Sequence, residues 1–295
     1  MLGIIYALIT VFAWGTWLAP SQRVPLKNQQ VRMFYLAAVN LAVASAISWS
    51  RGSTGLTWQQ FWPPFAGGLV WAASGLCAFT ATARLGMAKA FGIWAPLNIL
   101  VSLVCGRVLF GEFRQPGALK LLLLGVAVVV IIAGVLFIVF AKGETGGPSG
   151  GSALTVGLLG ALGAGVLWGV YYLPIQRSGV SMWVAAWPMA LGIFAGSLAL
   201  LLLGRESPKL ARPGDYARVG ATSCLWTVGN YGMLLLVGHL GAGQGFTIAQ
   251  LSLVVNALVG IYWLKEPGPG TPAARMTLLG CVLATAGGIL LGNLK

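Results

Sequence analysis

Ten long apolar stretches divide the sequence and constrain its fold more than any other feature. Each contains about 18–22 residues, and a helix needs about 20 residues to cross a bilayer at 1.5 Å per residue. Spanning backbone must satisfy its own hydrogen bonds, and the stretches lack the alternation of a membrane barrel. We therefore expect an all-α polytopic membrane protein with ten transmembrane helices. The stretches are residues 2–20, 33–50, 65–83, 91–110, 119–140, 154–173, 183–204, 219–238, 246–264 and 276–293.

The composition supports a lipid environment. Hydrophobic residues make up 58% of the chain and charged residues only 8%, whereas soluble domains carry about 25% charged residues. The net charge of +13 comes from basic residues scattered over short loops, which excludes a clustered nucleic-acid surface. Twelve of the 18 basic residues fall on the side of the loop after the first stretch. This bias predicts a multi-pass protein of the cell membrane with both termini outside.

An internal repeat relates the two halves of the chain. The motif Trp14-Gly15-x4-Pro20-x-Gln22-Arg23 recurs at an offset of 154 as Trp168-Gly169-x4-Pro174-x-Gln176-Arg177. Gly106-x5-Glu112 recurs at the same offset as Gly260-x5-Glu266. A Gly/Ser-rich segment at the midpoint has the composition of a flexible linker. We predict a first five-helix repeat over 1–141, a linker over 142–153 and a second repeat over 154–295.

An odd number of spans in each half has a geometric consequence. The second half must enter the membrane from the opposite face, so the repeats are inverted. Many secondary transporters are built on this plan, with a central site at the repeat interface. The sequence therefore predicts a small-solute transporter that works by alternating access.

The candidate substrate-binding residues are neutral amides and aromatic residues within the spans. Buried amides are costly in lipid unless they face a partner or a cavity. Amides both donate and accept hydrogen bonds, and aromatic rings offer flat apolar faces. This combination suits a neutral sugar, and the lipid bilayer is a further expected partner. The candidates are Trp14, Trp71, Asn98, Trp168, Tyr172, Trp226, Asn230, Gln250 and Asn256.

Helix packing is the alternative for several of these aromatic residues, and tryptophans near span ends are more typical of an interfacial belt. We assign Trp49, Trp58, Trp62 and Trp263 to such a belt.

Acidic residues are absent from the middle of every span. The repeat pair Glu112 and Glu266, at the ends of two spans, are the candidates for coupling or gating. The alternative is that they anchor helix ends beside Arg114 and Lys265.

Motifs of enzymes and metal sites are also missing. The sequence has no GxSxG, Walker or HExxH motif, and the sole histidine, His239, has no second histidine or nearby cysteine to complete a site. The four cysteines lie in apolar segments without CxxC pairing. We expect no enzymatic activity, no catalytic residues, no metal and no cofactor.

Four short segments carry a resemblance to a known family. Leu109-Phe110-Gly111-Glu112 and Trp263-Leu264-Lys265-Glu266, each followed by a glycine-bearing last helix, resemble the repeat of the drug/metabolite transporter superfamily. The segments Leu225-Trp-Thr-Val-Gly-Asn230 and Gly260-Ile261-Tyr262 are similar to its glucose-uptake and rhamnose-transport branch.

The resemblance implies a ten-helix carrier that imports a monosaccharide such as glucose or rhamnose, with protons as the candidate coupling ion. The two halves are not chemically equivalent, because Asn230 is matched by Gly75 and Gln250 by Pro96 or Ala95. An exporter of drugs, nucleosides or amino-acid-like metabolites is the alternative on the same fold. A receptor or scaffold is a third hypothesis that no residue favours.

Overall fold

The structure is a computed structural model that describes residues 2–26, 28–51, 55–111, 117–141, 151–240, 245 and 248–294. All regular structure in these residues is helical. The long helices are α1 (Leu2–Thr16), α2 (Gln29–Ser50), α3 (Trp58–Leu85), α4 (Met87–Phe110), α5 (Ala118–Phe140), α6 (Gly151–Val170), α8 (Met182–Leu203), α9 (Pro213–Leu240) and α12 (Pro272–Gly292). The short elements are the 3₁₀ turn η1 (Ala19–Ser21), α7 (Leu173–Ser178), α11 (Leu251–Leu258) and the π-helical segment η2 (Val259–Leu264).

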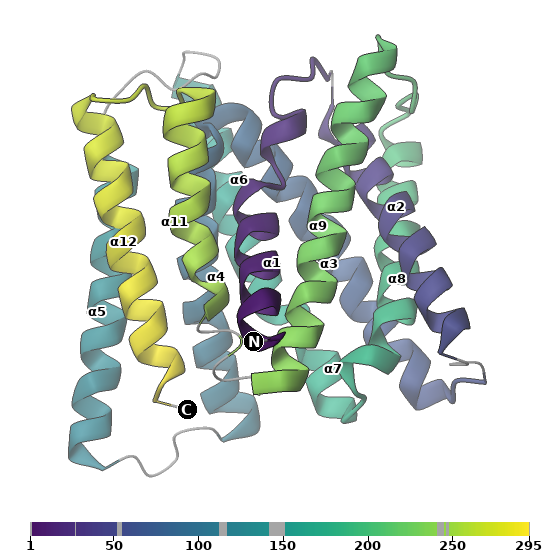
Figure 1. Cartoon of the computed structure of the whole chain (residues 1–295), viewed down its shortest axis with the longest axis horizontal. Helices are drawn as coiled ribbons and strands as arrows, with labels where there is room; N and C mark the ends of the chain where they lie inside the picture. The colour runs from purple at the N-terminus through teal and green to yellow at the C-terminus, as the bar shows by residue number, and fades with distance from the viewer. Residues whose placement is uncertain are drawn as a thin grey trace.

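Eight helices in the described chain are long and apolar enough to cross a membrane. The predicted all-α membrane protein is therefore confirmed at this level. Helix α9, with 28 residues, and the apolar segment Leu251–Leu264 are not among the eight. Both nevertheless run side by side with the others in one bundle (Figure 1). Three belt tryptophans, Trp49, Trp58 and Trp263, are more than 60% exposed, as expected for side chains that face lipid headgroups.

Local sequence signals set the helix ends. Ser181 caps α8 by accepting a hydrogen bond from the Val184 amide at 3.4 Å. Thr271 caps α12 in the same way through the Ala274 amide at 3.1 Å. Gly86 separates α3 from α4 with a φ of +79°, a conformation that favours glycine.

The predicted linker is shorter than its composition suggested. Helix α6 begins at Gly151, so residues 151–153 form its first turn rather than part of the linker over 142–153. A Ser-Ala pair can continue a helix once the following turn is fixed by packing, so composition alone places this boundary poorly. Residues 142–150 lie outside the described residues.

The first helix of each half packs into the other half. Helix α1 contacts α9 and α11, and α6 contacts α3 and α4. A Cβ atom built on Gly15 of α1 would lie 2.5 Å from Val255 Cβ and 3.2 Å from Ser252 O. Built on Gly169 of α6, it would lie at the same two distances from Val101 Cβ and Asn98 O. Each of these partners is again 154 residues from its counterpart, so the two crossings are equivalent in sequence and in geometry.

Candidate functional site

Four tryptophans from four helices meet in the largest buried core of the protein. The ring centroids of Trp71 on α3 and Trp226 on α9 are 4.5 Å apart, and those of Trp71 and Trp168 on α6 are 5.7 Å apart. Trp94 on α4 lies edge-on to Trp168, with centroids 5.4 Å apart. We call Trp71, Trp94, Trp168 and Trp226 the tryptophan cluster. Its rings present large flat apolar faces near the interface between the halves.

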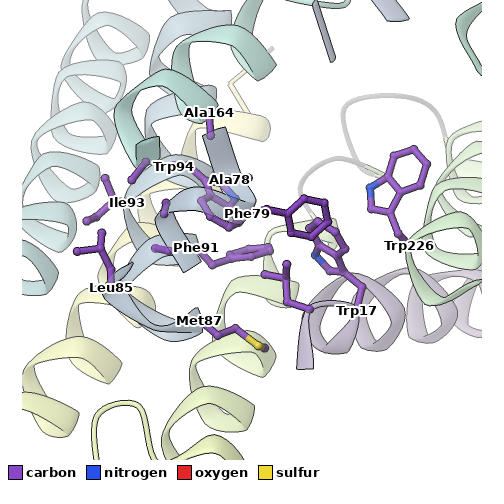
Figure 2. Packing of buried hydrophobic residues seen from close by; sticks show 14 of the residues in the cluster. Trp17, Ala78, Phe79, Leu85, Met87, Phe91, Ile93, Trp94, Ala164 and Trp226 are labelled. Carbon is purple, nitrogen blue, oxygen red and sulfur yellow. The ribbon is translucent and has the colours of Figure 1, made fainter. Parts of the chain in front are cut away.

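The tryptophan cluster includes three of the predicted site residues and one that the sequence reasoning missed. Trp94 is 2% exposed and packs beside Phe91, with centroids 5.3 Å apart (Figure 2). Its apolar surroundings in the sequence fit a core or a lipid-facing position equally well. No sequence pattern distinguishes these two environments for a single ring.

Trp14 and Trp168, which occupy equivalent positions in the repeat, each have an unpaired indole N–H. The indole Nε1 atoms of Trp14 and Trp168 are both buried, and neither has a hydrogen-bond partner among the described residues. Trp14 lies against Gly229 of α9, where an added Cβ would come within 2.3 Å of its ring. Buried donors without partners are rare in native proteins and call for water or a ligand.

Asn256 on α11 is the most strongly buried of the predicted amides. Its side chain is 0% exposed, and both Nδ2 and Oδ1 lack hydrogen-bond partners within the described chain. The residue at the matching position of the first half is Ser102, whose hydroxyl donates to Gly169 O at 3.2 Å and to Asn98 Oδ1 at 3.4 Å. Asn98 is therefore partly satisfied at the α4–α6 crossing, while Asn256 is not. The hydroxyl of Thr227, one residue after Trp226, is likewise buried without a partner among the described residues.

The remaining predicted residues lie on α9, at the start of α7 and before α11. Asn230 follows Trp226 by one turn of α9 and is half-buried. Tyr172 is at the start of α7, with its ring centroid 6.2 Å from that of Tyr171. Gln250 packs on α12, where its carbonyl oxygen accepts from the Thr285 hydroxyl at 3.5 Å and its side chain lies beside Gly288.

Glu266 belongs to a separate polar network at one end of the bundle. The side-chain amide of Gln22 donates to Thr82 O at 2.8 Å and to Glu266 Oε2 at 3.3 Å. The Met87 amide also donates to Glu266 Oε2, at 3.4 Å. Arg23 donates to Leu264 O at 2.8 Å. These bonds join the segment after α1, the α3–α4 junction and the end of η2.

Burial raises the pKa of the Glu266 carboxyl above its ordinary value, because desolvation disfavours the charged form. The Met87 amide, the Gln22 amide and the Arg23 charge oppose this increase. Glu266 thus makes specific bonds across helices, beyond the simple anchoring of its own helix end. Its repeat partner Glu112 lies outside the described residues.

The repeat counterparts of Gln22 and Arg23 are in a different environment. Gln176 and Arg177 are both exposed, and neither side chain has a hydrogen bond within the described chain. Gln22 and Arg23 therefore form hydrogen bonds at one end of the bundle. Their counterparts at the other end form none with the described residues.

The centre of the bundle combines stacking surfaces with unpaired donors and acceptors. Indole N–H groups donate hydrogen bonds, whereas the Asn256 amide and a threonine hydroxyl can each donate and accept them. A hydroxyl group both donates and accepts, so it complements each of these kinds of group. Among the described residues, no group of three His, Cys, Asp or Glu side chains could hold a metal ion.

Known proteins resemble this chain over its full length. Residues 5–294 match the family model described as "Sugar transport protein". A protein of Lactococcus lactis, provisionally named a sugar uptake protein, is 28% identical, covering 100% of this chain and 99% of its own length. A protein of Bacillus anthracis with the same provisional name is 25% identical over 100% of both chains. One solved crystal structure has a TM-score of 0.59 and 19% identity, covering 98% of this chain and 95% of its own, which shows a shared fold.

Proposed function

Because the chain belongs to the sugar transport protein family, we propose that it is a secondary transporter that moves a monosaccharide by alternating access. Two observations carry this proposal: the tryptophan cluster, and the interior polar atoms without partners in the described chain. Stacked rings complement the C–H faces of a sugar, and the unpaired groups complement its hydroxyls.

Family membership confirms several predictions made from the sequence. The predicted sugar-transport resemblance is confirmed, as is a multi-pass membrane protein, by the family match and the apolar helices together. The family is one of transporters, which also confirms the prediction that the chain is not an enzyme.

The proposed architecture has ten spans in two inverted repeats, 1–141 and 154–295. The equivalent crossings at Gly15 and Gly169 support the repeat. The positions of α9 and of α11 with η2 inside the bundle support two spans beyond the eight that hydropathy identifies (Figure 1). The two ends of the chain also lie toward the same end of the bundle, as an even number of spans requires.

In this proposal, the polar network around Gln22 and Glu266 is a gate. Its bonds close one face while the equivalent Gln176 is exposed at the other. The two repeats would exchange these environments as the transporter changes state. Trp71, Trp168 and Trp226 would stack on the sugar, Asn256 would bond its hydroxyls, and Glu266 would serve in gating or coupling.

The gate predicts unequal effects for an equivalent pair of substitutions. Gln22→Ala removes two hydrogen bonds and should lower the free energy of unfolding by about 1–3 kcal/mol. Gln176→Ala removes an exposed side chain that has no hydrogen bonds to the described residues. It should change the free energy of unfolding by less than about 0.5 kcal/mol. Thermal unfolding in detergent, followed by tryptophan fluorescence, measures both. Equal effects of the two substitutions would contradict the assignment of a closed and an open face.

Uptake into vesicles tests the function itself. Reconstituted protein should accumulate or equilibrate labelled D-glucose or L-rhamnose faster than empty vesicles. Trp226→Phe should raise the half-saturating sugar concentration several-fold, since stacking on an aromatic side chain contributes about 0.5–1.5 kcal/mol and depends on ring size. Trp263→Phe, on an exposed tryptophan, is the matched control. Transport of nucleosides or amino acids but no sugar would favour the exporter alternative.

A further inference from the structure

A polar cavity lies apart from the tryptophan cluster, at the face of the bundle that the proposed gate closes. Its volume is about 190 Å³, which at about 30 Å³ per water molecule corresponds to roughly six waters. It opens where α1 and α3 end and α2 begins. Its polar lining consists of Gln22, Gln29, Arg32, Thr82 and Glu266.

The most unusual residue of this cavity is Arg32, in the first turn of α2. Its side chain is 1% exposed, with Nη2 donating to Ser21 O at 2.7 Å and the guanidinium 5.2 Å from the centre of the Phe79 ring. Nε and Nη1 have no hydrogen-bond partners among the described residues. A buried guanidinium with free donors is costly unless acceptors reach it, so a small side-chain movement toward an occupied cavity would be favourable.

Residues that line the same cavity also carry acceptors. Oε1 of Gln22 and Oε1 of Gln29 are both buried and unpaired within the described chain, and Glu266 adds a carboxylate. Glu266 would repel an anion, and Arg32 would repel a cation. Hydroxyl groups both donate and accept, so a neutral polyhydroxyl solute matches this mixed lining better than an ion of either sign.

Packed rings lie between the cavity residue Arg32 and the buried core. The Phe79 ring lies 5.2 Å from the Arg32 guanidinium, and its centroid is 5.5 Å from that of Trp17. Trp17 belongs to the same buried core as Trp226 (Figure 2). Gln22, a wall of the cavity, is also the donor that closes the gate.

We propose that this cavity is a second binding station, where a neutral polyhydroxyl solute binds between the gate and the water on the closed face. The inference rests on the proposed sugar transport and adds a site that the tryptophan cluster does not include. Gln29 and Arg32 hold the solute there through its hydroxyls, and Gln22 does so as the gate opens.

Protection of an introduced thiol tests the station. In a background with Cys77, Cys105, Cys224 and Cys281 replaced by alanine, Ala83→Cys places a thiol on the half-buried cavity wall. At a D-glucose or L-rhamnose concentration ten times its Kd, labelling by a hydrophilic maleimide should slow about tenfold, because only unoccupied protein reacts. Ala217→Cys, exposed near the start of α9, is the control and should show no protection. If Ala83→Cys does not transport, Leu26→Cys on another wall repeats the measurement.

A second substitution separates direct binding from a gate movement that hides the thiol. Gln29→Ala should raise the half-protecting sugar concentration about fivefold, the effect of one hydrogen bond. Gln30→Ala, next to Gln29 but outside the cavity lining, should leave it unchanged. Sugar uptake without protection, protection insensitive to Gln29→Ala, or equal protection by inorganic phosphate would each overturn the station while the transport function stands. Absence of any sugar uptake would overturn the proposed function, and the station with it.

Discussion

Asn256→Leu is expected to reduce sugar uptake about tenfold to hundredfold without lowering the stability of the protein. The amide is fully buried, and neither polar atom has a partner within the described chain. If both atoms bond solute hydroxyls, the loss of each hydrogen bond weakens binding by about 1–1.5 kcal/mol. A change of about 1.4 kcal/mol corresponds to a factor of ten in the binding constant. Leucine has nearly the same shape, and replacing an unpaired polar group by an apolar one is neutral or stabilising.

Initial rates in vesicles and thermal unfolding in detergent give the two readouts. Asn293→Leu is the matched control, because the exposed Asn293 side chain donates to Ile289 O of the preceding turn at 3.0 Å and has no other partner among the described residues. It should leave uptake unchanged. Wild-type uptake by Asn256→Leu would show that this amide does not serve the solute, and a loss of stability would show that it has a structural partner such as water.

Gly192→Ala is expected to destabilise the folded protein strongly, although it adds only one methyl group. A Cβ atom on Gly192 of α8 would lie 2.1 Å from Phe65 O and 3.1 Å from Gly68 Cα, both on α3. Backbone atoms cannot move aside as a flexible side chain can, so α3 and α8 must separate. Overpacking of this kind costs about 1–3 kcal/mol or more, which exceeds the gain of up to about 1 kcal/mol from the higher helix propensity of alanine.

Size-exclusion profiles and thermal unfolding of the detergent-extracted protein measure this effect. Gly125→Ala in α5 is the control, since nothing lies within 4 Å of its added Cβ. There, the propensity gain should act alone, and stability should be unchanged or higher. A Gly192→Ala protein as stable as the Gly125→Ala protein would mean that α3 and α8 are not held at this close distance.

Residue patterns predicted the helices well and the site only in part. Trp71, Trp168 and Trp226 were predicted as site residues, and the structure brings their rings together. Trp94 was missed, because an apolar neighbourhood does not show whether a ring faces lipid or core. Gln250 was chosen as an isolated amide in a span, yet its neighbours include Thr285 and Gly288 of α12.

The sequence also did not show which basic residues are buried. Arg32 and Lys89 were counted among the loop charges of one membrane face. In the structure, Arg32 is 1% exposed in α2, and Lys89 is 8% exposed in α4, donating to Ala141 O. Both residues lie near helix starts, where sequence alone cannot separate a solvated charge from one that another helix covers.

The sequence by itself determined that this chain is a bundle of membrane helices, because long apolar stretches in lipid have no other way to satisfy their backbone hydrogen bonds. The internal repeat in the sequence also predicted that the chain consists of two related halves. Only the tertiary structure decided which polar atoms are left unpaired inside the described chain, such as those of Asn256 and Arg32. The physical reason is that a side chain's burial and partners depend on helices far away in the sequence, whose approach is set by packing and not by local pattern.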